Sequence, residues 1–158
     1  MGQFDSFEIP TEVIMDSFIV RKMCASDIEI DFVAVTSSVD IIKKQTGGDW
    51  PAADATYEDN YIDLCWHQRE FEYKNSFAYI VTNLEGTESK GCIYVFPKKH
   101  FFNDDIKYLP EDCDVVIDMW VTQKAFDDGF YVELYNFFQE WIKLWPYEKP
   151  YFSNKLKV

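Results

Sequence analysis

The sequence predicts an α/β (α+β) fold, in which a mixed, mostly antiparallel central sheet carries helices on both faces. Strand-like and helix-like stretches follow one another along the chain, two of the strand-like stretches form a hairpin, and the most apolar strand leads directly into an amphipathic helix. The chain has 158 residues, the size of one ordinary domain, and no Pro-, Gly- or Ser-rich linker divides it. We therefore expect a single domain over residues 1–158.

The first predicted elements are a strand and a two-part helix. Residues 17–25, SFIVRKMCA, alternate and are rich in residues that favour strands. The following stretch, SDIEIDFVAVTSSVDIIKKQT, has Ser26 or Asp27 as the N-cap and apolar residues at helical spacing. We expect this helix to break near residues 37–38 and to resume briefly.

A long helix is predicted from Thr56. The stretch TYEDNYIDLCWHQREFEY begins with an N-cap residue and has acidic residues in its first turn, where the helix dipole favours them. Its spacing places four residues on one face, namely Tyr61, Leu64, Cys65 and Gln68.

Two further strands, SFAYIVTN and GCIYVFPKK, are joined by LEGTESK and predict an antiparallel hairpin. Residues 100–112 read as a connector. Residues 113–121, CDVVIDMWV, form the most strongly strand-like stretch and are apolar on both faces, which is typical of an inner strand. The last helix is predicted over about 127–145, and a short strand over 151–158 closes the sheet.

Composition excludes several classes of function. The formal net charge is −13, and a surface of that sign repels nucleic acids and anionic membranes. The four cysteines include no C-x-x-C pair and there are only two histidines, so we expect neither a metal site nor a disulfide framework. The sequence contains neither a signal peptide nor a run of apolar residues long enough to span a membrane, so we expect a cytoplasmic protein.

The order of the predicted elements resembles that of the GNAT superfamily of acyl-CoA-dependent N-acyltransferases, from about Ser17 to the last strand. In that family the turn after the central strand has the form V-x-(P)-x-x-[R/Q]-x-x-G-x-[G/A]. With Val121 on the valine, Gly129 falls on the first glycine, Phe126 on the Arg/Gln position and Tyr131 on the second small residue. Because family members usually continue beyond the last strand into a helix that supplies a tyrosine as general acid, the resemblance implies a divergent, C-terminally short member.

The resemblance implies acetyl-CoA as co-substrate and an amine as acceptor. The backbone N–H groups of Met119, Trp120 and Val121 would hold the pantetheine arm and the thioester oxygen. The turn would bind the pyrophosphate at a helix N-terminus; its residues are Phe126, Asp127, Asp128, Gly129, Phe130 and Tyr131. Asp118 would deprotonate the amine, since an ammonium ion has no lone pair with which to attack.

His67 and Glu70 lie three residues apart on the long helix, which predicts neighbouring surface positions. They are candidates for acid–base chemistry or acceptor recognition, and the simpler interpretation is a surface hydrogen bond beside a buried Trp66 or Phe71. The acidic surface favours a cationic acceptor, either a small amine or a lysine side chain. Two alternatives stay open. One is a GNAT-like binding or regulatory module without cofactor affinity, favoured by Phe126, Asp127, Asp128 and Tyr131, and the other is an interaction domain that forms a homodimer.

Overall fold

The computed structural model describes residues 6–100 and 109–158. Within these residues, six strands form one sheet in the order β1-β2-β3-β4-β5-β6, and every neighbouring pair is antiparallel except the parallel pair β5–β6. The strands are β1 (Glu12–Ile14), β2 (Ile19–Lys22), β3 (Phe77–Thr82), β4 (Ser89–Pro97), β5 (Val115–Val121) and β6 (Pro150–Phe152). The predicted fold class, the hairpin and the inner position of β5 are confirmed.

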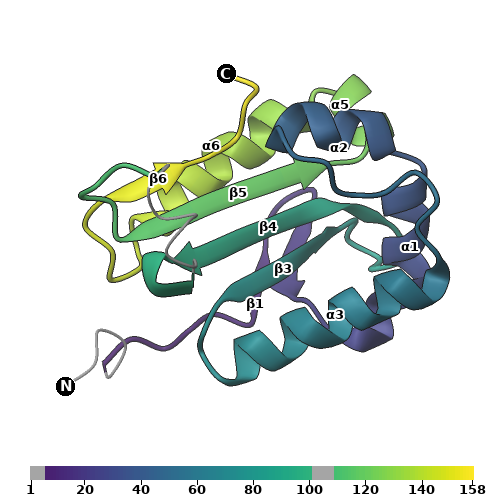
Figure 1. Cartoon of the computed structure of the whole chain (residues 1–158). Helices are drawn as coiled ribbons and strands as arrows, with labels where there is room; N and C mark the ends of the chain where they lie inside the picture. The colour runs from purple at the N-terminus through teal and green to yellow at the C-terminus, as the bar shows by residue number, and fades with distance from the viewer. Residues whose placement is uncertain (1–5, 101–108) are drawn as a thin grey trace.

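Helices cover both faces of this sheet (Figure 1). The first face carries α1 (Ile28–Thr36), α2 (Val39–Thr46) and α3 (Tyr57–Glu72), with a short 3-10 helix η1 (Ala25–Asp27) before α1. The second face carries α6 (Phe130–Ile142), which lies behind β5 in the view. The predicted break at residues 37–38 is confirmed. The predicted cap of α3 is also confirmed, because Thr56 Oγ1 accepts a hydrogen bond of 3.1 Å from the Asp59 amide.

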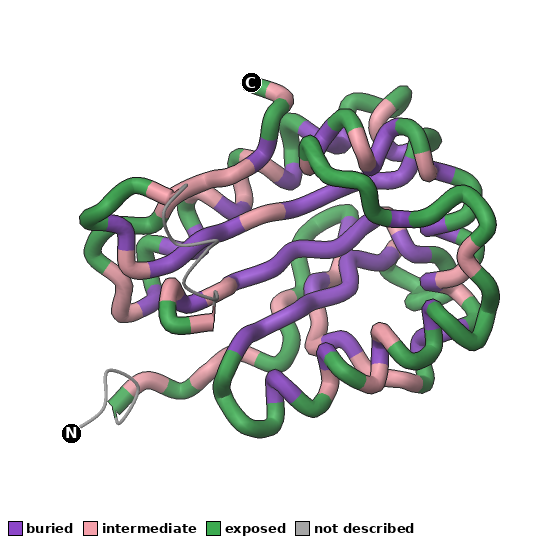
Figure 2. Tube along the Cα trace, in the orientation of Figure 1, coloured by how far each residue is buried: buried purple, intermediate pink, exposed green. Residues whose placement is uncertain are grey.

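Strand β5 separates two cores, and its alternating side chains serve one core each. Val115, Ile117, Met119 and Val121 belong to the core beneath α6, and Trp120 belongs to the core beneath α1 and α3. Figure 2 shows the middle strands buried along their length, whereas the surrounding loops are exposed. Burial on both sides explains why this stretch is apolar on both faces.

Four predictions about the elements were wrong in detail. Strand β1 was not foreseen; it is three residues long and exposed except at Val13, so it leaves almost no apolar pattern. The strand predicted over residues 17–25 is observed as β2, which spans only Ile19–Lys22. The last strand ends at Phe152 instead of Val158. The helix predicted over 127–145 is α6, which spans only Phe130–Ile142; a short α5 (Gln123–Asp127) before it was not predicted, and Gly129 in the left-handed conformation lies between the two.

The face predicted for α3 was also wrong. The buried stripe runs through Asn60, Leu64, His67 and Phe71, while Tyr61 is exposed. Because Asn60 and His67 are polar, the buried stripe cannot be recognised from the spacing of apolar residues alone.

The predicted connector over residues 100–112 falls mostly outside the described residues, and a 3-10 helix η2 (Lys98–His100) precedes it. Among the helices described, none combines the length and the apolar character that crossing a membrane requires.

Candidate functional site

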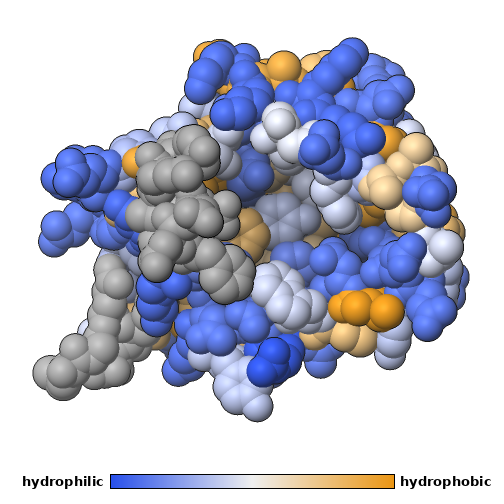
Figure 3. Space-filling model, viewed as in Figure 1, coloured by the Kyte–Doolittle hydropathy of each residue, from blue (hydrophilic) through white to orange (hydrophobic). Residues whose placement is uncertain are grey.

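A pocket of about 300 Å³ opens on the face of the sheet that carries α2 and α3. Figure 3 shows this face hollowed over the strands, between these two helices. The lining residues come from both helices, from the segment between them and from two strands; they are Thr46, Trp50, Asp63, Trp66, His67, Tyr94, Phe96, Asp118 and Trp120. The fold therefore brings two predicted catalytic residues, His67 of α3 and Asp118 of β5, to the same cavity.

Asp118 is a half-buried carboxyl group in the middle of β5. Its Oδ1 accepts a hydrogen bond of 2.9 Å from the Met119 amide. Burial raises its pKa to about 7, and the hydrogen bonds from Met119 and Ser153 and the charge of Lys155 only partly oppose this rise. A carboxyl group with such a pKa exchanges its proton readily near neutral pH, as a general base requires.

His67 lies on the buried stripe of α3, and only 8% of it is exposed. Its Nε2 is 3.6 Å from Asp63 Oδ2, whereas its buried Nδ1 has no hydrogen-bond partner among the described residues. Burial lowers the pKa of His67, although the carboxylates of Asp63 and Glu70 oppose this shift. A neutral imidazole with Nε2–H facing Asp63 leaves the lone pair of the buried Nδ1 without a hydrogen-bond donor among the described residues.

Glu70 is not part of this pocket. It lines a separate cavity of about 270 Å³ together with Asn75, Lys99 and His100. The predicted surface pair of His67 and Glu70 was wrong, since both side chains are buried and Trp66 is 40% exposed. The α3 stripe turns His67 towards Tyr94, with ring centroids 5.5 Å apart, and leaves Trp66 at the rim of the pocket.

Asp63 escaped the reading of the sequence, whereas Trp50 was considered only as one of many aromatic residues that could fill the core or line a pocket. Asp63 precedes His67 by four residues, and this spacing on a helix was a usable indication of an Asp–His pair. Trp50 follows α2 in an irregular segment, and nothing in the local sequence places it opposite Trp120, where the ring centroids are 6.1 Å apart.

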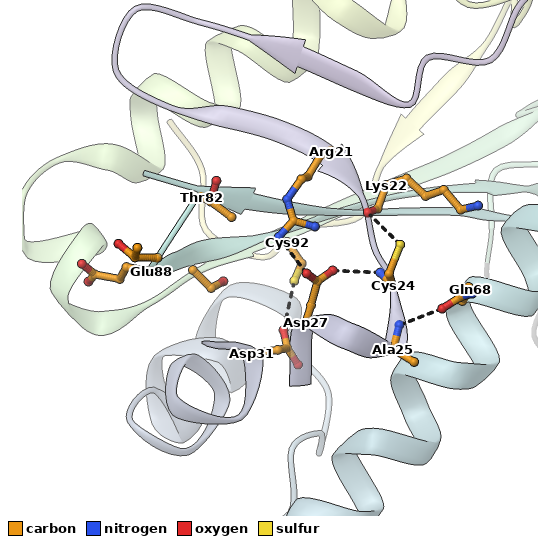
Figure 4. Close-up of polar contacts among 12 residues, drawn as sticks. Arg21, Lys22, Cys24, Ala25, Asp27, Asp31, Gln68, Thr82, Glu88 and Cys92 are labelled. Atoms are coloured by element: carbon orange, nitrogen blue, oxygen red, sulfur yellow. Dashed lines mark hydrogen bonds and ion pairs between the residues drawn. The ribbon is translucent and has the colours of Figure 1, made fainter. Parts of the chain in front are cut away.

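The positions of α1 and α3 over the sheet are fixed by a polar cluster at the end of β2 (Figure 4). Buried Asp27 forms an ion pair of 2.7 Å with Arg21 and accepts a hydrogen bond of 2.8 Å from the Cys24 amide. The Ala25 amide donates to Gln68 of α3 at 2.8 Å. These contacts tie the start of α1 and the middle of α3 to one strand, so the two helices are held at fixed positions over the sheet.

Beyond Ile117, β5 and the C-terminal segment separate, and two carboxamide side chains occupy the free edge of β5. The Met119 amide donates to Asn154 Oδ1 at 2.9 Å, and Asn154 Nδ2 donates to the Met119 carbonyl at 2.7 Å. Gln45 of α2 pairs with Val121 in the same way, with both hydrogen bonds at 2.9 Å. Trp120 lies opposite Cys92 in the β4–β5 ladder. The backbone groups predicted to hold a pantetheine arm are thus engaged within the protein, and their role in binding a cofactor stays a prediction.

The turn after β5 is more open. Gly129 has φ of +82°, no side chain caps the first turn of α6, and a Cβ added at Gly129 would meet nothing within 4 Å. Asp127 and Asp128 are exposed beside it. Tyr131 does not cover the turn, because its hydroxyl points inward and donates to the Leu156 carbonyl at 3.0 Å.

The two remaining predicted cofactor residues at the turn differ in exposure. Phe130 is buried, and Phe126 is half-buried with its ring centroid 5.9 Å from that of Tyr131. Within the predicted turn, the amides of Phe126, Asp128 and Gly129 already donate to backbone carbonyls. What remains for an anion is the start of α6, which has no side-chain cap and has two carboxylates beside it.

No protein-family model matches the sequence, and no curated protein matches it in sequence. Solved structures do resemble its fold. RimL, a ribosomal L7/L12 alpha-N-protein acetyltransferase, matches in its apo form with a TM-score of 0.58 and 12% identity, over 85% of this chain and 64% of RimL. RimL in complex with coenzyme A matches with a TM-score of 0.53 and 13% identity, over 73% of this chain and 56% of that one.

The microcin C7 self-immunity acetyltransferase MccE, in complex with acetyl-CoA and AMP, matches with a TM-score of 0.58 and 13% identity, over 84% of this chain and 67% of MccE. The chain spans less than two thirds of the length of both RimL structures. These likenesses show that the chain has the fold of the GNAT acetyltransferases, as the order of its predicted elements implied.

Proposed function

We propose that this protein, which has the fold of the GNAT acetyltransferases, transfers an acetyl group from acetyl-CoA to a primary amine bound in the pocket. The observation that carries the proposal is the meeting of Asp118 and His67 in one cavity beside the point where β5 leaves its parallel neighbour. Residues 1–158 would act as one GNAT-like domain in the cytoplasm, and homodimer formation is part of the same proposal.

The proposed reaction is a direct attack in a ternary complex. A bound ammonium ion gives one proton to Asp118, and the amine then attacks the thioester carbonyl. A C–N bond forms, the C–S bond breaks, and the second proton of the nitrogen passes to the departing thiolate to give the thiol. His67 Nδ1 accepts a hydrogen bond from the amine and orients it. Glu70, outside the pocket, acts on this site only through its charge, which raises the pKa of His67.

Acetyl-CoA would supply the activated acetyl group. The turn residues 126–131 would hold its pyrophosphate, and the edge of β5 at Met119, Trp120 and Val121 would hold its pantetheine arm. The turn fits an anion, because the first turn of α6 has no side-chain cap. The pantetheine arm would hydrogen-bond to the edge of β5 only after the side chains of Gln45 and Asn154 have left the backbone groups of Met119 and Val121.

A second candidate function is an amine-binding module that does not use a cofactor. The specific observation in its favour is that four hydrogen bonds from Gln45 and Asn154 already satisfy the edge of β5. The exposed carboxylates of Asp127 and Asp128 beside the turn add repulsion towards a pyrophosphate.

Thermal denaturation with and without acetyl-CoA separates these two candidates. A ligand at a hundred times its dissociation constant stabilises the folded state by about 2.7 kcal/mol, which raises the melting temperature by several degrees. Mass spectrometry of a panel of primary amines incubated with protein and acetyl-CoA then detects acetylated products. An unchanged melting temperature at millimolar acetyl-CoA, together with no acetylated product, would favour the module without cofactor.

A further inference from the structure

The walls of the pocket are mainly aromatic. Five of its nine lining side chains carry aromatic rings other than imidazole; they are Trp50, Trp66, Tyr94, Phe96 and Trp120. The floor is rigid, because Trp120 Nε1 donates to the Tyr94 hydroxyl at 2.9 Å and the rings of Tyr94 and Phe96 are stacked with centroids 5.4 Å apart. A floor of fixed aromatic rings favours a flat or alkyl group that stacks on it.

Two tryptophans stand at the mouth of the pocket with large exposed surfaces. Trp50 is 41% exposed and Trp66 is 40% exposed. Tryptophan carries more apolar area than any other side chain, so leaving two of them this exposed in the lining of one cavity does little for folding. Both rings are placed where a bound molecule would cover them.

The charges that line the pocket are of one sign. Asp63 and Asp118 are acidic, and the described lining residues include no lysine or arginine. Burial raises the pKa of both carboxyl groups, and the charges of His67 near Asp63 and of Lys155 near Asp118 oppose this rise only in part. A cation entering the pocket would supply the missing countercharge.

The unpartnered nitrogen of His67 is an independent indication of a ligand. A buried polar atom without a partner costs about 1–3 kcal/mol and is rare in folded proteins. His67 lines the pocket, and its Nδ1 is buried without a hydrogen-bond partner. An N–H donor on a bound molecule would satisfy it.

We infer that the pocket binds a singly charged organic amine with a compact apolar body, whose ammonium group lies among Asp63, Asp118 and His67 and whose body stacks on the tryptophans. The volume of about 300 Å³ is at the lower end for ligand pockets and suits a molecule with one aromatic ring or a similar alkyl group. The rings would also attract the charge itself through cation–π interactions. The inference specifies the amine of the proposed function, but the binding that it describes needs no cofactor.

Titration calorimetry without acetyl-CoA tests the inference with four probes of one shape: 2-phenylethylamine, its N,N,N-trimethyl derivative, 2-phenylethanol and 3-phenylpropionate. We expect the two cations to bind at least about tenfold more tightly than the alcohol, since an ion pair or cation–π contact in a partly desolvated site contributes about 1–2 kcal/mol. The carboxylate should not bind. Equal affinity for the alcohol and the amines, or no binding of either cation, would overturn the inference.

Matched variants locate the binding. Trp66→Ala and Asp63→Asn should each weaken binding of 2-phenylethylamine by about tenfold. Tyr61→Ala is the aromatic control, because Tyr61 lies on the same helix, is 43% exposed and does not line the pocket. The remote, exposed Asp16→Asn controls for the change in net charge. A loss as large in the controls as in the pocket variants would also overturn the inference.

The outcome is separable from that of the proposed function. Binding of the cations without acetylated product supports the inference and counts against the transferase. Acetylation of other amines by a protein that does not discriminate among the four probes supports the transferase and overturns the inference.

Discussion

Burial raises the pKa of Asp118 to about 7, compared with 3.8 for an exposed aspartate, and this difference links its ionisation to folding. Between these two values the unfolded chain has released the proton while the folded chain retains it, so the free energy of unfolding decreases as the pH rises from about 4 to 7. Asp31 acts in the same direction, because burial raises its pKa to about 6. His67 acts in the opposite direction below its ordinary pKa of 6.5, because the unfolded chain takes up the proton first.

Replacing Asp118 by asparagine removes one of these contributions. The full shift corresponds to about 4 kcal/mol at 1.36 kcal/mol per pKa unit, and because the side chain is only half-buried we expect about 2 kcal/mol. Asp118→Asn should therefore raise the free energy of unfolding at pH 8 by about this amount and change it little at pH 4. Urea denaturation of both proteins at the two pH values measures the difference. If the variant is less stable than the wild type at pH 8, the ionised carboxylate of Asp118 does not destabilise the folded state.

Single residues of the site differ in how far the sequence reveals them. Asp118 could be predicted, because a lone acidic residue in an apolar strand is conspicuous and the resemblance gave it a role. His67 was named, but its burial was not foreseen, since burial depends on which stripe of α3 faces the sheet. Of the polar residues in this stripe, Asn60 is buried because a specific partner receives it: Asn60 Nδ2 donates to buried Asp31 at 2.9 Å. Such a pairing between residues 29 positions apart leaves no local pattern.

At the scale of elements, the separated edge of β5 decides whether a cofactor can enter. Gln45 holds both backbone groups of Val121 from α2, as a neighbouring strand would. Gln45→Ala removes two buried hydrogen bonds, each worth about 1 kcal/mol, and should lower the free energy of unfolding by about 2 kcal/mol. If the pantetheine arm takes the same edge, this variant should bind acetyl-CoA more tightly than the wild type, because the displacement of Gln45 no longer opposes binding.

Thermal shift with acetyl-CoA and denaturation with urea measure the two effects separately. Gln123→Ala is the matched control, since the exposed side chain of Gln123 donates to Asp127 Oδ1 at 2.9 Å and the amide that donates to Ser38 is kept in the variant. Weaker acetyl-CoA binding in Gln45→Ala than in the control would mean that Gln45 supports the cofactor site instead of occupying it.

Two glycines near the end of β5 are required for different physical reasons. A Cβ at Gly91 of β4 would lie 2.1 Å from the Trp120 carbonyl oxygen, because the two strands approach closely there. At Gly129 the space is open and only the positive φ of +82° opposes a side chain. Gly91→Ala should therefore lower the free energy of unfolding by more than about 3 kcal/mol, and Gly129→Ala by about 1–2 kcal/mol. Urea denaturation of the pair ranks them, and an equal loss in both variants would show that the close approach at Gly91 relaxes without cost.

The elements that could be predicted are those with a long and consistent pattern. Strand β5 is an apolar run interrupted only by Asp118, helix α6 has an apolar stripe at helical spacing, and Thr56 marks the start of α3 by its side-chain chemistry. Strand β1 could not be predicted, because a three-residue edge strand buries little. Helix α5 was missed because its start depends on Thr122 Oγ1, which accepts a bond of 3.2 Å from the Ala125 amide within a segment that reads as a polar turn.

At the scale of the whole molecule, the order of the elements was sufficient to predict the sheet and the layers, whereas the pocket was not foreseen as a unit. Its walls come from the segment after α2, from α3, and from β4 and β5, so no stretch of sequence contains it. Trp50 and Trp66 appear in the sequence as two aromatic residues among many. Only the packing of α2 and α3 over the sheet brings both tryptophans, partly exposed, into the lining of one cavity.

The net charge of −13 also acts on the molecule as a whole. At pH 8 the excess negative charges lie closer together in the folded chain than in the unfolded chain. Their mutual repulsion therefore lowers the free energy of unfolding. Salt at about 0.2 M reduces the screening length to below about 10 Å and should weaken this repulsion.

We therefore expect the melting temperature at pH 8 to rise by several degrees between about 0.01 M and 0.2 M sodium chloride. The same titration at pH 4.5, close to the sequence pI of about 4.4, is the internal control, because the net charge there is near zero and salt has little repulsion to screen. Few ion pairs oppose this expectation, since those of Lys124, Lys143 and Lys149 are exposed and contribute little. A melting temperature that falls with salt at pH 8 would mean that attractive ion pairs outweigh the repulsion among the excess negative charges. In that case the attraction of a cationic amine to the pocket would have to come from Asp63 and Asp118 alone.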